Sequence, residues 1–590
     1  MNFAMMLVVS AIISFLTLVI AIHFIDERTS YIIKNDKFTA FTRLTLIILL
    51  CIFTIGSVFY AGQRSLSWFI MQTVCTGINI VLMLTKKVKS LDVLVAPLLI
   101  TALTSIAIMS AQGTPIIGSD QWRDFVAAQT IIMDGNYWRA SAFLPVYNKP
   151  APIMEMLTAI LSTVTGSTLF YSYSILTIIF PILAVLALYI AVYDVVKDRV
   201  ALVAASLLVL SNPMIFLWMV VHNVFASLLS LLFFGTFLRS YRSLDLPMPG
   251  RFCTPLLLAT AVIMQHASPV VGIILLIIAT ISSTIIKVIR REAKKSALYS
   301  LLRFLLIIVI IMLIYWVCTI IFEWIIRFQV RFVRKVSFHP VTSPMPALQA
   351  KNVMVALSYS IPVAFASAYV YRCLLLNVLV RSKEESVNMI FAFSAIMGGA
   401  LLFLGFLIFY TYGAWSDTRY LGTPGYLLLL IPAAICFSLL IRRGRGWVKV
   451  LAISLSLIML YSGSISAGWA PDQYNTTTTR FHDIHSQNVA LTLVELIPDS
   501  STVTAVRGVD DPFYCVSALY GKSFNVDQEF LHLLYYKKGS ELRPEEVIKF
   551  VRFDQLLILD AETIQPFLAY YPNININVYY TSGQYFILSR

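Results

Sequence analysis

Charged side chains are scarce in this sequence. They make up 13% of its 590 residues, where a soluble globular protein carries about 25%. Hydrophobic residues reach 59%, and the mean hydropathy is +0.81. This composition excludes a soluble globular protein and predicts a polytopic α-helical membrane protein. The net charge of +14 does not indicate nucleic-acid binding, because Lys and Arg cluster in short segments between apolar runs, as the positive-inside rule requires.

Cysteine is also sparse, and its spacing excludes a disulfide or zinc framework. The seven cysteines include no CxxC pair and no Cys/His cluster, and most lie inside apolar runs, where a thiol behaves as a small hydrophobic group. The N-terminus lacks both a basic segment and a clear small-residue cleavage site. Its first apolar run is therefore interpreted as a membrane span rather than a removed signal peptide.

About fourteen apolar runs come close to the roughly 20 residues that a membrane span needs. Residues 1–90 contain the first three, and residues 91–469 contain the others. Basic segments such as 287–295 and 442–449 fall on one side of the membrane in this count. We assign that side to the cytoplasm of a prokaryotic cell, so the protein is expected in the plasma membrane.

Two loops and the C-terminal part then face outward. The loop 323–352 is basic despite being external, which suggests an anionic partner such as a phosphate or a lipid headgroup. Residues 470–590 contain no apolar run of spanning length. Their short apolar runs, such as "STVTAV" and "FDQLLILD", alternate with polar turns, and "PEEVIKFVR" has the pattern of an amphipathic helix. This part is predicted to be an extracytoplasmic soluble α/β domain.

The first external loop, residues 112–167, is long, and long ordered loops tend to be functional. "SDQWRDFVAAQTIIMDG" combines an N-terminal Ser, early Asp residues and a final Gly, which predicts a helix over 119–134. Asp120 and Asp124 are four residues apart and share a face of that helix. "APIMEMLTAILSTVTG" predicts a second helix over 151–165, too short for a span and placed along the membrane interface.

This arrangement resembles the GT-C superfamily of integral-membrane glycosyltransferases. That superfamily includes protein O-mannosyltransferases, aminoarabinose transferases and oligosaccharyltransferases. The resemblance is carried by Asp120 early in the first long external loop, by the two loop helices and by the proline-rich entry "YNKPAPIMEML". "QHASP" at 265–269 and "SDTRYLGTPGYLLLLIPA" at 416–433 agree with it, and the match covers roughly residues 91–590. The sequence departs in lacking a WWDYG-type motif, a strict Asp-x-Asp and, in the first external loop, an adjacent Asp-Glu pair, so the subfamily is open.

The resemblance implies transfer of a sugar from a polyprenyl-phosphate carrier to a glycan, lipid or protein acceptor, with inversion. Asp120 is expected to be the general base, with Glu155 as a second catalytic carboxylate. The leaving phosphate needs cationic partners, expected to be Lys149, Arg419, Arg327 and Arg331. The residues expected to bind the substrate are Arg123, Asp124, Trp122, Tyr137, Trp138 and His266. The reaction does not require a metal, and a divalent ion such as Mg or Mn is left open.

Three other functions remain open. A transporter or flippase of lipid-linked glycans tends to bury charges near mid-membrane and to show repeated halves. The apolar runs here hold few charges, and ionisable groups gather at the outer mouth. A lipid-glycan polymerase or ligase also has one large external loop but leaves residues 470–590 unexplained. A structural scaffold leaves the acidic loop unexplained.

Replacing Asp120 with Asn separates these functions. Sugar transfer is expected to be lost, because the amide cannot accept the acceptor's hydroxyl proton. Transport or scaffolding is expected to survive the change. An assay of sugar transfer with reconstituted protein measures the first outcome, and an assay of lipid-linked glycan translocation measures the second.

Overall fold

A computed structural model describes much of the chain. The described residues are, apart from a few single positions, 97–105, 119–136, 151–198, 200–211, 222–242, 248–291, 293–319, 359–371, 386–412, 415–443, 446–466, 492–499, 501–505, 555–560, 577–582 and 585–589. The chain forms two compact units. The membrane unit comprises Met1–Ala111, Pro145–Met154 and Ser174–Thr476, and the loop unit comprises Gln112–Leu144, Glu155–Tyr173 and Thr477–Arg590.

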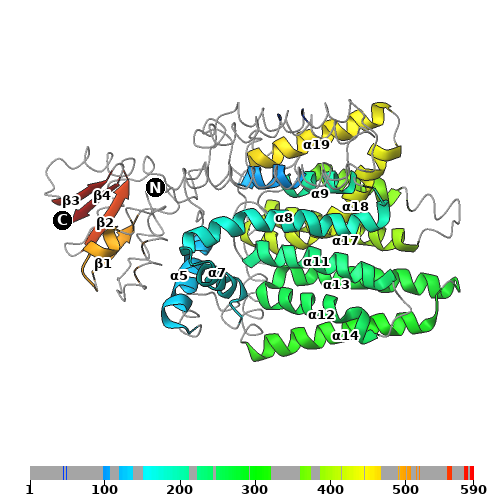
Figure 1. The fold of residues 1–590 in the computed structure, drawn as a ribbon, viewed down its shortest axis with the longest axis horizontal. Coiled ribbons are helices and arrows are strands. Elements are labelled where there is room, and N and C mark those ends of the chain that lie inside the picture. The colour runs from blue at the N-terminus through cyan, green and yellow to red at the C-terminus, as the bar shows by residue number, and fades with distance from the viewer. Residues whose placement is uncertain are drawn as a thin grey trace, which may run out of the picture. The chain divides into compact units, whose positions relative to one another are not determined.

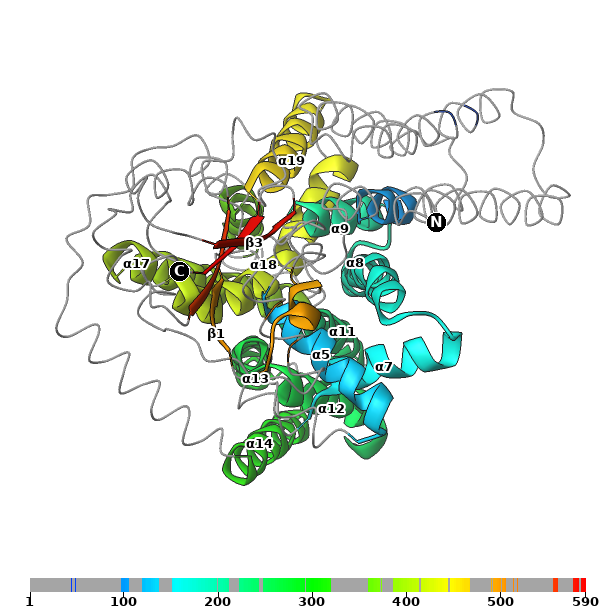
Figure 2. The same cartoon turned by 90° about the vertical axis from the view of Figure 1, so that its left-hand side faces the viewer.

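Helices dominate the described residues. They are α5 (Ser119–Asp134), α7 (Ile153–Thr165), α8 (Leu169–Val196), α9 (Val200–Leu210), α11 (His222–Arg242), α12 (Met248–Gln265), α13 (Ala267–Ile289), α14 (Lys295–Cys318), α17 (Ser386–Tyr412), α18 (Trp415–Arg443) and α19 (Gly446–Ser466). Figure 1 shows the helices of the membrane unit side by side in one bundle, and Figure 2 turns that bundle toward the viewer.

Five described helices are long and apolar enough to cross a membrane. They cover Leu169–Tyr193, His222–Arg242, Pro269–Ile289, Lys295–Cys318 and Leu421–Arg442. Each overlaps a run for which the sequence predicts a span, so a polytopic helical membrane protein is confirmed for the described residues. The total of about fourteen spans stays a prediction, because residues 1–90 lie almost entirely outside the described part.

Helix α9 covers only part of the apolar run over residues 200–217, which the sequence counts among its predicted spans. It has 11 residues, ten of them buried, and it ends at Leu210. At 1.5 Å per residue it is about 16 Å long, roughly half the hydrocarbon core of a bilayer. The sequence reason is Pro213, which disfavours helical geometry in the residue before it.

Helix α18 lies at the centre of the membrane unit, and α14 lies at its edge. The apolar stretch of α18 is 89% buried, whereas that of α14 is only 22% buried. Both views place α14 at the margin of the bundle (Figures 1 and 2). α14 therefore offers most of its side chains to lipid.

Helices α17 and α18 pack through a backbone contact between two glycines. A Cβ added at Gly398 would lie 2.7 Å from the carbonyl oxygen of Gly425, and one added at Gly425 would lie 2.8 Å from that of Gly398. Small residues at such a crossing let helix backbones approach closely, which replaces the hydrophobic driving force that lipid cannot supply. Ser394 strengthens the same contact, since its hydroxyl donates to the carbonyl oxygen of Leu428 at 3.0 Å.

Asp198 connects three helix ends in the membrane unit. Its Oδ1 accepts the backbone N–H of Val200 at 3.0 Å, which caps the start of α9. Its Oδ2 lies 3.5 Å from Nε of Arg442, near the end of α18. Arg442 also donates from Nη1 to the carbonyl oxygen of Val196, the last residue of α8, at 2.9 Å. One acidic and one basic side chain thus fix how α8, α9 and α18 meet.

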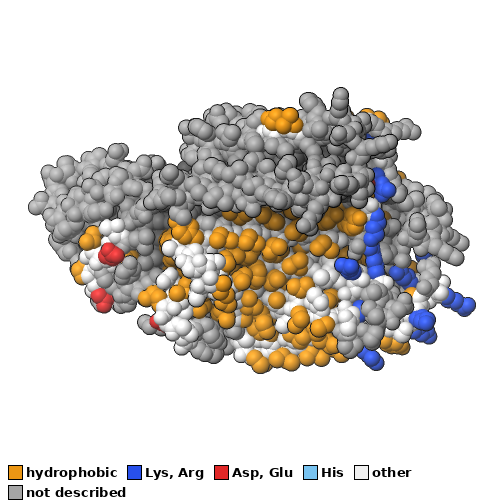
Figure 3. All heavy atoms as spheres, in the orientation of Figure 1, with side chains coloured by type: hydrophobic (Ala, Val, Ile, Leu, Met, Phe, Trp, Pro, Cys, Tyr) orange, Lys and Arg blue, Asp and Glu red, His pale blue; other side chains and the backbone are white. Residues whose placement is uncertain are grey.

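The charges of the membrane unit gather at one end. Figure 3 shows a wide apolar belt with Lys and Arg side chains clustered beyond one of its edges. The described part of the predicted basic segment 287–295 lies at the junction of α13 and α14. This distribution is the one the positive-inside rule produces.

The loop unit contains the two helices that the sequence predicts. Helix α5 begins at Ser119 and ends at Asp134, and Gly135 follows it with φ +62°. Helix α7 ends at Thr165, and Gly166 follows with φ +62°. Glycine adopts this left-handed conformation without steric cost, which explains why both helices stop there.

The C-terminal part of the loop unit contains a four-stranded sheet. Its strands are β1 (Thr502–Ala505), β2 (Gln555–Asp560), β3 (Asn577–Ser582) and β4 (Tyr585–Ser589), in the order β1-β2-β4-β3. β1 pairs parallel to β2, and the other two pairs are antiparallel. β1 and β2 fall in the short apolar runs "STVTAV" and "FDQLLILD". The predicted helix "PEEVIKFVR" lies outside the described residues, so the α/β character of this part stays a prediction.

We expect Gly398→Ala to destabilise the membrane unit by about 1–3 kcal/mol, because its methyl group would overlap the backbone of α18. Thermal unfolding of the detergent-solubilised protein measures this loss. Gly399→Ala is the matched control: a Cβ at this neighbouring position meets nothing within 4 Å. Equal loss in both variants would contradict the packing described here.

Candidate functional site

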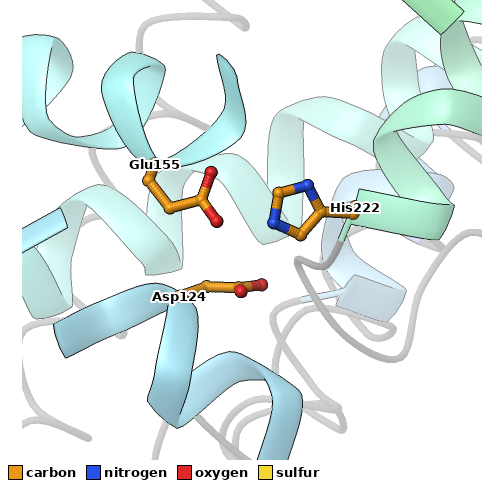
Figure 4. Close-up of side chains that lie close together, drawn as sticks. All are labelled: Asp124, Glu155 and His222. Carbon is orange, nitrogen blue, oxygen red and sulfur yellow. The ribbon is translucent and has the colours of Figure 1, made fainter. Parts of the chain in front are cut away.

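Two carboxylates of the loop unit lie close together. Asp124 is in the second turn of α5 and is 2% exposed, and Glu155 is in the first turn of α7 and is fully buried. One oxygen from each lies within 4.8 Å of the other. Figure 4 shows the two carboxylate groups approaching each other from their separate helices. The loop's two helices therefore each contribute one acid to what we call the acidic pair, Asp124 and Glu155.

Tyr173 lies beside this pair, near the start of α8. It is the fifth residue of α8, whose candidate span begins at Leu169. Tyr173 is fully buried and lies close enough to both carboxylates to interact with their charges. The acidic pair therefore lies beside the first turns of α8.

Aromatic rings form the packing around the pair. Trp122 is fully buried, and its ring meets those of Phe125 and Phe170 edge-on, at centroid distances of 5.5 and 6.4 Å. Phe125 also contacts Phe170 at 4.8 Å and Tyr173 at 6.1 Å. These contacts join α5 to the start of α8. They fix the rotation of α5 and so aim Asp124 toward Glu155.

This arrangement has a chemical use. Two buried carboxylates in close proximity favour a bound cation, because like charges in a dry site repel. Carboxylate oxygens are the ligands that hard divalent cations prefer.

The residues expected from the sequence have different outcomes. Asp120 and Arg419 lie in α5 and α18 as second and fifth residues, but their side chains are outside the described part. Arg123 is half-buried on α5, and His266 is buried at the junction of α12 and α13. Lys149, Tyr137, Trp138, Arg327 and Arg331 lie outside the described residues. The roles of all these residues stay predictions.

The structure shows what surrounds Trp122 and Asp124, which the sequence could not. Both were expected to touch substrate. The Trp122 ring packs against two phenylalanines inside the loop unit, which is a structural contact. Asp124 is the described carboxylate of α5 that faces Glu155. Sugar stacking on Trp122 stays a prediction.

The sequence did not single out two buried residues of the structure, Tyr173 beside the pair and His222 in the membrane unit. Tyr173 lies at the start of an apolar run, where an aromatic residue is ordinarily attributed to the interfacial belt. His222 stands at the start of another run. At both positions the sequence signal was a polar side chain near the start of an apolar helix.

Comparisons with known proteins found similarity in structure alone. No family model and no curated protein matches the chain. The apo oligosaccharyltransferase of Archaeoglobus fulgidus is 13% identical, with a TM-score of 0.48 over 80% of this chain and 70% of that one. Apo ArnT from Cupriavidus metallidurans is 12% identical, with a TM-score of 0.46 over 84% of this chain and 97% of that one.

A second structure of the archaeal enzyme is also similar to the chain. It is AglB from Archaeoglobus fulgidus in complex with an inhibitory peptide and a dolichol-phosphate. It is 12% identical, with a TM-score of 0.46 over 81% of this chain and 70% of that one. At such identities and TM-scores, the chemistry of this chain has to be argued from its own residues.

Proposed function

We propose that this protein is a membrane glycosyltransferase of the GT-C kind. It moves a sugar from a polyprenyl-phosphate carrier to a glycan, lipid or protein acceptor outside the cytoplasm. The observation that carries the proposal is the buried acidic pair beside the first turns of a membrane-spanning helix. Buried acids beside the start of a long apolar helix fit chemistry on a phosphate carried by a membrane lipid.

The proposed chemistry divides the acids of the loop helices into two roles. Asp120, one helical turn before Asp124, removes the proton of the acceptor hydroxyl. The hydroxyl oxygen then bonds to the anomeric carbon as the bond from that carbon to the phosphate oxygen breaks. The sugar inverts, and polyprenyl phosphate leaves.

The acidic pair fits a divalent cation. Both groups offer hard oxygen ligands, both are buried, and their separation is small enough for one ion to touch both. A bound Mg or Mn ion would supply positive charge to the departing phosphate. Lys149, Arg419, Arg327 and Arg331 are proposed to hold the same phosphate from other parts of the chain. Tyr173 is proposed to orient the carboxylates.

The described spans favour this function over transport. None of the five contains an Asp or a Glu. A transporter tends to place ionisable groups on its path through the membrane. Here the buried acids cluster beside a span end instead. Placement of the C-terminal sheet outside the cytoplasm, where it would bind the acceptor, belongs to the same proposal.

A lipid trapped by an inactive variant tests the donor. We expect mass spectrometry of lipids that co-purify with Asp120→Asn to reveal a polyprenyl-phosphate sugar, because the variant binds the donor but cannot complete transfer. Asp134→Asn is the matched control, since Asp134 is exposed in the last turn of the same helix. Only bulk phospholipid from folded Asp120→Asn would contradict the proposal, and a complete polyprenyl-linked glycan would favour a transporter or ligase.

Cation binding by the acidic pair is tested by thermal unfolding. Two charged carboxylates within 4.8 Å repel by on the order of 3 kcal/mol at an effective dielectric constant near 20. Mn²⁺ is therefore expected to raise the Tm of the wild type. Asp124→Asn and Glu155→Gln should lose this rise, and in EDTA each should melt no lower than the wild type, because its repulsion is gone.

Controls make this result specific. Asp134→Asn should keep the full Mn²⁺ response. A wild-type Tm that ignores Mn²⁺, or an equal response in Asp124→Asn, would contradict cation binding by the pair.

A further inference from the structure

The segment that leads into α7 has few hydrogen-bond donors of its own. It reads Pro150-Ala151-Pro152, and neither proline has a backbone N–H. Pro152 stands directly before Ile153, the first residue of α7, and its side chain has no oxygen that could cap the helix. The conformation of this entry therefore depends on contacts from elsewhere in the chain.

A glutamine at the end of α12 supplies such a contact. The side-chain Nε2 of Gln265 donates to the carbonyl oxygen of Ala151 at 3.1 Å, across 114 residues of sequence. The same oxygen accepts the backbone N–H of Ile153 at 2.9 Å. Both bonds lie within the membrane unit, which contains Pro145–Met154 as well as Gln265. One carbonyl oxygen thus joins the first residue of α7 to the end of α12.

The end of α12 is itself held in place. Gln265 is the last residue of this helix and is 1% exposed. The hydroxyl of Tyr315, on α14, donates to the carbonyl oxygen of Met264 at 3.2 Å. The backbone N–H of His266 donates to the carbonyl oxygen of Val262 at 3.0 Å, so the helical pattern extends to the residue after Gln265. The amide of Gln265 therefore projects from a fixed backbone.

Stability alone does not explain the Gln265 amide. A carbonyl oxygen can only accept, so the bond to Ala151 determines which end of the amide faces it. The other end, Oε1, is buried and has no hydrogen-bond partner in the described part of the chain. Leaving a buried acceptor unpaired costs about as much free energy as one hydrogen bond contributes. An apolar side chain of similar length would serve stability equally well, which indicates that the contact to Ala151 has another use.

We propose that Gln265 is a positioning residue for Glu155. By holding the carbonyl of Ala151, it keeps the first turn of α7 in its conformation, and Glu155 is the third residue of that helix. Fraying of this turn would move the carboxylate of Glu155 away from that of Asp124. The use of Glu155 as a cation ligand rests on the proposed function, whereas the hold of Gln265 on the first turn does not.

Hydrogen exchange of the full-length, detergent-solubilised protein tests this hold. Gln265→Met keeps the approximate length of the side chain and removes the donor. We expect the amides of residues 153–156 to exchange about fivefold faster in this variant, the ratio that one hydrogen bond is worth. The Tm of Gln265→Met should stay close to that of the wild type, because the lost bond and the lost unpaired oxygen offset each other.

The response to Mn²⁺ tests the consequence for Glu155. We expect Gln265→Met to need about tenfold more Mn²⁺ than the wild type for half of the rise in Tm, the lower end of what a metal site loses when the support of a ligand is removed. A merely structural residue would lower the Tm and leave this midpoint unchanged.

Thr260→Val is the matched control. The hydroxyl of Thr260 donates to the carbonyl oxygen of Leu256 at 2.9 Å within α12, so this variant also loses one side-chain hydrogen bond of that helix. Its exchange at residues 153–156 and its Mn²⁺ midpoint should match the wild type. Unchanged exchange in Gln265→Met, or an unchanged Mn²⁺ midpoint, would overturn the proposal. A wild type that ignores Mn²⁺ would contradict the cation at the acidic pair, and the exchange rates would still decide whether Gln265 holds α7.

Discussion

Hydrocarbon offers no hydrogen-bond partner, and this constraint governs where the membrane unit places its polar side chains. Buried hydroxyls return to their own helix: Ser230, Thr280 and Ser438 each donate to the carbonyl oxygen four residues earlier, at 2.7–2.8 Å. Other hydroxyls join helices, as when Thr101 meets Ser206 at 3.1 Å. Polar groups thereby become structural contacts inside the bundle rather than costs.

The acidic pair of the loop unit does not follow this pattern of polar groups in structural contacts. Asp124 and Glu155 are buried beside each other, although two charged carboxylates repel. The surrounding rings of Trp122, Phe125 and Phe170 compensate by packing α5 firmly against the start of α8. A protein keeps such a costly arrangement where the chemistry requires it, which is why the proposed function rests on this pair.

Local patterns in the sequence predicted the helices well. Gly135 and Gly166 determine where α5 and α7 stop, and apolar length located the five described spans. The site was harder to predict. Asp120 and Asp124 share a helix face, so spacing alone could not say which would meet Glu155. That choice depends on the rotation of α5, which Phe170 and Tyr173 set from a segment about 50 residues later.

The glycine contact between α17 and α18 also bears on how the chain is made. These helices are consecutive, and the connection between Tyr412 and Trp415 is short. Their close approach needs no partner from elsewhere, since Gly398 meets Gly425 across the hairpin itself. Contacts between neighbours in sequence form fast because little loop entropy opposes them. α17 and α18 can therefore pack against each other while the ribosome is still adding α19. α18 then enters the membrane in contact with α17.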